Sequence, residues 1–123
     1  MLIFRVQHRD TTEGPYTGEW WREKDDMRWS HNDDRHPAPF ADPKLAAIRY
    51  SERCGCATPK ALLEWFEGYW EPMADGDYVV VILAAKERRV GESGQVVYTA
   101  DRATQLDVLE IDTFLGLFAE LPA

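Results

Sequence analysis

The chain has 123 residues, of which 45% are hydrophobic and 29% charged, a balance that is ordinary for one folded domain. It argues against intrinsic disorder and against two domains, so we expect residues 1–123 to form a single domain. Acids outnumber bases 22 to 14, for a net charge of −8, which argues against binding to the phosphate backbone of nucleic acids. No apolar run approaches the roughly 20 residues of a membrane span. The N-terminus also lacks the basic start of a secretory signal, so we expect a cytoplasmic protein without membrane contact.

The excess of acids belongs to the second part of the chain. Residues 1–50 hold 8 bases and 9 acids, whereas residues 51–123 hold 6 bases and 13 acids. The nearly neutral first segment is therefore the part that could receive a small phosphorylated ligand.

A first strand is predicted at residues 2–8, which are rich in β-branched and aromatic side chains, and Gly14-Pro15 indicates a turn after it. Alternation along this strand places Arg5 and Gln7 on one face. The other face is that of Phe4, Val6 and His8.

A long polar loop is predicted from Thr17 to Phe40, and a short helix could follow at residues 43–50. Three tryptophans in this polar loop exceed what a small core needs, and exposed aromatic side chains often mark binding surfaces. They are Trp20, Trp21 and Trp29.

The main helix is predicted at residues 58–71, because Thr58 is a good N-cap and Pro59 suits the first helical position. Its apolar residues recur with helical period, at Leu62, Leu63, Phe66, Tyr69 and Trp70. We expect Pro72 and the turn at 75–77 to end this helix.

Strands are predicted next at residues 78–85, 95–99 and 106–111, with a charged turn at 86–94 and an apolar tail at 113–121. The fold class is therefore α+β: a mostly antiparallel sheet with one main helix and a long N-terminal loop.

Cys54 and Cys56 are separated by one glycine, a spacing that would strain a disulfide and that matches no standard zinc pattern. A site of both thiols with His31 and His36 can be written down, but two small buried thiols in a turn are the favoured interpretation, so we expect no metal.

Four stretches resemble uncharacterised small proteins of phages and prophages. They are Phe4-Arg5-Val6-Gln7, Gly14-Pro15-Tyr16, the segment from Thr58 to Trp65-Phe66, and Glu92-Ser93-Gly94-Gln95-Val96-Val97-Tyr98. The resemblance implies a phage-encoded protein that works in the host cytosol.

More remotely, the same arrangement resembles a minimal ADP-ribosyltransferase-like fold. That resemblance implies NAD as cofactor, with Arg5 holding its diphosphate, His8 at the same first strand, and Tyr16 stacking on the nicotinamide. Gln95 or Glu92 would take the catalytic position. The paired glutamates of arginine-directed transferases are absent, so the domain could bind a nucleotide without turning it over.

The alternative hypothesis is a non-catalytic inhibitor of a host or bacterial protein with a basic surface, such as an anti-CRISPR or other anti-defence protein, or a toxin immunity protein. Glu64, Glu67 and Glu71 recur at i, i+3 and i+7, along one exposed helix face, and together with Trp20 and Trp21 they are the candidate partner-binding residues.

Each candidate also has a plainer interpretation. Arg5 could be a solvated or salt-bridged surface residue, Gln95 an exposed strand residue, and His8 a half-buried structural histidine. The three glutamates could simply be the solvated face of an amphipathic helix.

Overall fold

A computed structural model describes residues 2–15, 52–86, 88–91 and 95–119. The predicted loop at 17–40 and helix at 43–50 lie outside these residues, as do the candidates Tyr16, Trp20, Trp21, Trp29, His31, His36 and Glu92.

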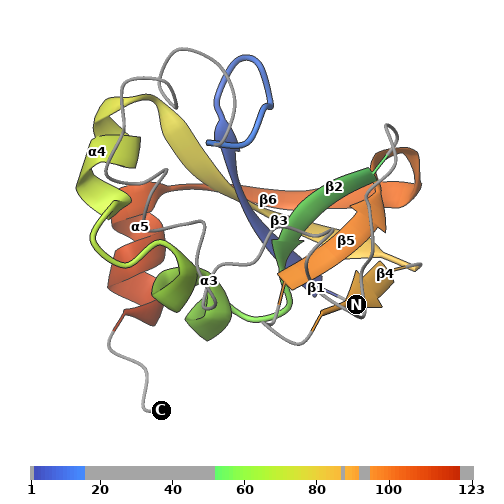
Figure 1. Cartoon of the computed structure of the whole chain (residues 1–123). Coiled ribbons are helices and arrows are strands. Elements are labelled where there is room, and N and C mark those ends of the chain that lie inside the picture. Colours follow the sequence, from blue (N-terminus) through green and yellow to red (C-terminus); the bar gives the residue numbers. More distant parts are fainter. Residues whose placement is uncertain (1, 16–51, 87, 92–94, 120–123) are drawn as a thin grey trace.

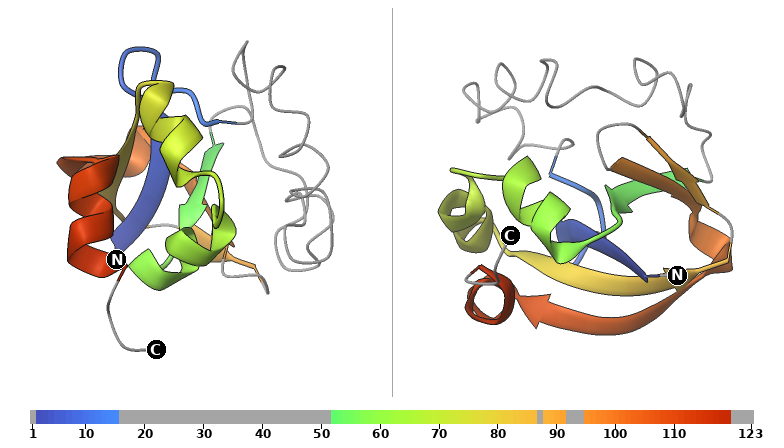
Figure 2. Two further views of the ribbon diagram at one scale, coloured as in Figure 1. Left: turned by 90° about the vertical axis from the view of Figure 1, so that its left-hand side faces the viewer. Right: turned by 90° about the horizontal axis from the view of Figure 1, so that it is seen from below.

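The described chain forms one antiparallel sheet of six strands in the order β4-β5-β2-β1-β3-β6 (Figure 1). The strands are β1 (Leu2–His8), β2 (Glu52–Cys56), β3 (Tyr78–Ala85), β4 (Arg88–Val90), β5 (Gln95–Thr99) and β6 (Ala103–Glu110). Three short helices accompany it in these residues: α3 (Pro59–Trp65), α4 (Trp70–Asp75) and α5 (Ile111–Phe118). The views of Figure 2 show the helices gathered at one side of the molecule, with β4 and β5 at the other. The predicted α+β class with a mostly antiparallel sheet is confirmed.

The predicted strands at 78–85 and 95–99 are confirmed with the same bounds, and the last strand lies at 103–110 rather than 106–111. Two strands were missed. β2 contains the two cysteines, which we expected in a turn, and β4 lies within the segment predicted as a charged turn. The apolar tail largely forms α5.

The predicted helix at 58–71 is divided into two. It begins as expected, because the Thr58 hydroxyl accepts a hydrogen bond from the Ala61 backbone N–H at 3.1 Å. α3 then ends at Trp65, and Gly68 has a φ of +89°, a conformation that glycine adopts without steric cost. Pro72 does not end the helix, since it lies in the first turn of α4, where its missing N–H costs no hydrogen bond.

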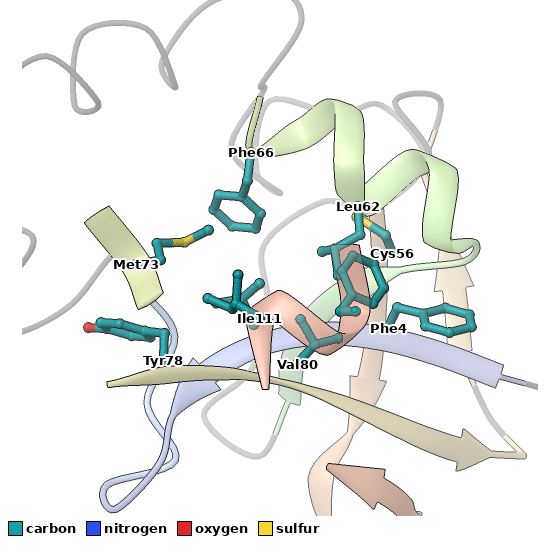
Figure 3. Close-up of a cluster of buried hydrophobic side chains, with 10 residues drawn as sticks. Phe4, Cys56, Leu62, Phe66, Met73, Tyr78, Val80 and Ile111 are labelled. Carbon is teal, nitrogen blue, oxygen red and sulfur yellow. The ribbon is translucent and has the colours of Figure 1, made fainter. Parts of the chain in front are cut away.

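The two faces of the sheet bury separate clusters, and the alternation predicted for β1 decides which residues belong to each. Phe4 and Val6 face the helices, where Leu62 lies beside Cys56 and Phe4 (Figure 3). Ile3 faces the other way and packs with buried residues of β3 and β5. These are Val79, Val81, Leu83, Ala85, Val96 and Tyr98.

Aromatic contacts join the helices to one another. The Phe114 ring of α5 lies with its centroid 5.4 Å from that of Trp70 in α4. The Trp70 indole N–H donates to the backbone oxygen of Leu63 at 3.3 Å, which links α4 back to α3. The helical layer over the first face is therefore held together as one unit.

Candidate functional site

The two edges of β1 are paired very differently. Seven residue pairs join β1 to β3, from Leu2 with Ala84 to His8 with Tyr78. A single pair, Phe4 with Cys56, joins β1 to β2. Among the described residues no further pair joins these two strands, which leaves an opening in the backbone ladder between them.

Gly55 lets β2 approach β1 closely at the point where they meet. A Cβ atom at this position would lie 2.6 Å from Cγ2 of Ile3 and 2.9 Å from the backbone oxygen of Phe4. Both separations are too short for real atoms, so the contact between the strands depends on the absence of a side chain.

The guanidinium of Arg5 occupies the opening between β1 and β2. Its Nη1 donates to the backbone oxygen of Cys54 at 2.8 Å, its Nη2 to that of Thr12 at 3.4 Å, and its Nε to Oε1 of Gln7 at 3.3 Å. The residue is only 8% exposed, and this burial lowers the pKa of its guanidinium. The interpretation of Arg5 as a surface residue is therefore wrong: the side chain replaces part of a backbone ladder.

A small pocket of about 60 Å³ lies at this opening. Arg5 and Gln95 are the buried polar residues of its lining, and Gln95 is only 6% exposed rather than an exposed strand residue. The other described residues around it are Val6, Gly14, Pro15, Cys54, Gly55, Cys56, Leu62, Trp65 and Phe66.

The pocket brings together residues that are far apart in the sequence. Arg5 and Gln95, which the transferase resemblance placed at one site, do line one cavity. Each of the four stretches that carry the phage resemblance contributes to the same cavity: Arg5, Gly14-Pro15, Trp65-Phe66 and Gln95. Sequence reasoning missed the contribution of β2, although the unusual Cys-Gly-Cys spacing was a signal for it.

Burial dominates the electrostatics of Arg5, and the neighbouring side chains act in both directions. In the described part of the chain no ion pair joins Arg5 to a carboxylate. After burial, which lowers the pKa of Arg5, the Tyr98 hydroxyl and the Cys54 thiol raise it and the Arg53 guanidinium lowers it. Burial raises the pKa of the nearby Tyr98 hydroxyl, so that group stays neutral at pH 7.

The two cysteines lie in β2 as free thiols, and burial decides their chemistry. It raises the pKa of Cys54 and raises the pKa of Cys56 to about 12. Both groups are therefore protonated at neutral pH, and a protonated thiol is a poor nucleophile and a poor metal ligand. Within the described ranges, no group of three or more histidine, cysteine or acidic side chains is placed to hold a metal ion.

His8 lies at the end of β1, on the face opposite Arg5. Its Nδ1 accepts hydrogen bonds from the backbone N–H groups of Asp10 and Thr11 at 3.1 and 3.4 Å, and its ring packs edge-on against Tyr78. The side chain thus closes the turn after β1, as the structural interpretation expected, and it does not reach the pocket with Arg5.

The predicted acidic residues are exposed, but they do not share one helix. Glu64 belongs to α3 and Glu71 to α4, while Glu67 lies in the connection between them. Lys60 is the base nearest in sequence to this segment, with its Nζ 3.9 Å from a carboxylate oxygen of Glu64. Asp75 and Asp77 continue the exposed acidic series.

Among known protein families, the one described as bacteriophage T4 Y00F protein matches residues 1–112, nearly the whole chain. No curated protein and no solved structure matches the chain, so the resemblance to an ADP-ribosyltransferase-like fold finds no support. Among the described residues, every helix is too short to cross a membrane.

Proposed function

The chain belongs to the bacteriophage T4 Y00F protein family, and we propose that it is a phage protein that acts by binding a host protein through an acidic surface. The observation that carries this proposal is the exposure of every acidic side chain between residues 64 and 77, a segment without any lysine, arginine or histidine. These residues are Glu64, Glu67, Glu71, Asp75 and Asp77.

The charge of this segment defines the kind of partner. Opposite charges steer two proteins together and select among partners, so the surface fits a protein with a basic channel or groove. Host proteins that hold nucleic acid have such grooves. Occupation of one would inhibit the host protein without catalysis, as an anti-defence or immunity protein would.

Charge reversal at Glu64, Glu67 and Glu71 tests this proposal. The triple lysine variant should no longer bind the host protein that the wild type binds, because the electrostatic attraction becomes repulsion. Raising the salt concentration from about 50 to about 300 mM should weaken the wild-type complex steeply, since screening shortens the range of the attraction.

A matched control variant has the same change in net charge, but at exposed positions outside the acidic surface. Asp10, Asp101 and Asp112 are exposed and lie outside residues 64–77. The variant with these three changed to lysine should keep most of the binding. Equal losses in both variants, or a complex indifferent to salt, would contradict a localised acidic surface.

A second candidate function is NAD binding, and it is favoured by the presence of Arg5 and Gln95 in one pocket. The cavity of about 60 Å³ would take only one phosphate group of the dinucleotide, since pockets for whole ligands start at about 300 Å³. Millimolar NAD should raise the melting temperature if this function holds, and Arg5→Lys should reduce the shift. An unchanged melting temperature would exclude it.

A further inference from the structure

The buried guanidinium of Arg5 has more hydrogen-bonding capacity than the described chain uses. A guanidinium carries five N–H groups, and three of them have acceptors, at Cys54, Thr12 and Gln7. Two N–H groups are left without an acceptor in the part of the chain that the structure describes.

Among the described residues, no carboxylate forms an ion pair with this group. Buried arginines are normally paired with a carboxylate, because a charge in a poorly solvated site is costly by itself. Here the hydrogen-bond partners are two backbone oxygens and an amide oxygen, which are neutral. The site therefore favours an anion that approaches through the pocket.

The dimensions and walls of the pocket restrict the kind of anion. A cavity of about 60 Å³ admits one small group. Apolar side chains from α3 and its end form one wall, namely Leu62, Trp65 and Phe66, and Pro15 adds to it. A doubly charged phosphate would lose its hydration against these walls with few donors to replace it. A planar carboxylate matches the fork of a guanidinium, and a short hydrocarbon chain behind it would contact the apolar wall.

We propose that the pocket between β1 and β2 binds a carboxylate carried on a short apolar group, with Arg5 as the residue that pairs with it. Gln95 brings a second polar side chain to the same lining. The carboxylate belongs either to a small free acid or to the C-terminus of a peptide. This site is separate from the acidic surface and does not depend on it.

Titration of the ¹⁵N-labelled chain with sodium propionate, followed by NMR, tests the proposal. Sodium chloride at equal ionic strength serves as the reference. Saturable shifts are expected for the Arg5 side-chain N–H and for the backbone amides of Gly14 and Gly55. Inorganic phosphate and NAD, titrated in parallel, should leave these signals unsaturated. Absence of saturation with propionate, or saturation with phosphate or NAD in its place, would overturn the proposal; the NAD result would instead support the second candidate function.

A variant at the pocket wall makes the test independent of whether an Arg5 variant folds. A Cβ atom at Gly14 would lie 3.4 Å from Nη2 of Arg5, so Gly14→Ala places a methyl group against the guanidinium. Propionate affinity should fall about tenfold or more. Gly116→Ala is the matched control, because a Cβ there meets nothing within 4 Å, and it should bind as the wild type does. Equal affinity in the wild type and in both variants would place the binding elsewhere.

A short peptide ending in leucine, compared with its C-terminal amide, identifies the source of the carboxylate. Where propionate binds, additional binding of the free peptide but not of its amide assigns a peptide C-terminus. Binding of propionate without binding of the peptide assigns a free acid. The triple charge reversal at Glu64, Glu67 and Glu71 should leave propionate binding unchanged. Carboxylate binding in the pocket and protein binding by the acidic surface are thus tested separately.

Discussion

The backbone polar groups on the two edges of β1 find their hydrogen-bond partners in different ways. Toward β3, a backbone ladder of seven residue pairs satisfies the strand's polar groups. Toward β2, one pair is followed by an opening, where the Arg5 side chain donates to a β2 carbonyl. The Arg5 side chain does not fill this opening completely, and a small cavity remains beside it. The regular edge of β1 therefore serves stability, whereas the open edge creates a pocket.

The largest effect is expected where β1 and β2 touch. Gly55→Ala should lower the free energy of unfolding by about 3 kcal/mol, because its Cβ would collide with the backbone of Phe4 as well as with Ile3. Urea denaturation measures the change. Gly116→Ala, in α5, should be neutral or slightly stabilising. A tolerated alanine at position 55 would mean that the two strands do not approach as described.

The next largest loss of stability is expected at Arg5, whose side chain bridges β1 and β2. Arg5→Met keeps the length of the side chain but removes its donors, and it should cost about 2 kcal/mol because buried acceptors such as the Cys54 carbonyl lose their partners. Arg9→Met is the control, since Arg9 forms an exposed bidentate pair with Glu110. The loss of stability in Arg9→Met should be clearly smaller than in Arg5→Met. Denaturation curves that rank the two arginines the other way would break the comparison between the edges of β1.

A smaller effect is expected at the start of α3, the helix that covers the pocket. Thr58→Ala removes the hydroxyl that accepts from the Ala61 N–H and should cost about 1 kcal/mol. Thr58→Ser keeps the acceptor and should recover most of this stability. Equal losses in both variants would show that the methyl group, not the cap, is responsible.

The smallest effect near neutral pH concerns the thiols of β2. Burial raises the pKa of Cys56 to about 12, so the native state resists ionisation that the unfolded state undergoes near pH 9. Stability should therefore be unaffected by these thiols at pH 7 and fall as the pH rises from about 9 toward 12. Native protein at pH 8 should react slowly with a thiol reagent, and denatured protein rapidly. Rapid reaction of the native Cys56 would contradict its burial.

Local sequence patterns predicted the elements whose structure depends mainly on residues close together in the sequence. Alternation assigned the faces of β1, and the pair Thr58-Pro59 located the start of α3. The strands at 78–85 and 95–99 follow from their β-branched residues. Exposure of Glu64, Glu67 and Glu71 was also predicted, although the break at Gly68 divides their helix.

The parts that were missed depend on contacts distant in sequence. β2 has little intrinsic strand propensity and exists because it pairs with all five residues of β5. The burial of Arg5 depends on the carbonyls of Thr12 and Cys54, and the second of these lies 49 residues away. Alternation gave the face on which Arg5 lies but not the opening into which it reaches, so the pocket could be assembled only once the pairing of β1 was known.

The most direct test of the account is the exchange of the Arg5 side-chain N–H with water, measured by NMR at about pH 8. We predict a slowly exchanging Nε–H signal, because this group donates to Oε1 of Gln7 in a buried site, while the signal of the exposed Arg53 is lost to rapid exchange. An Arg5 signal that exchanges as rapidly as that of Arg53 would contradict a guanidinium held between β1 and β2.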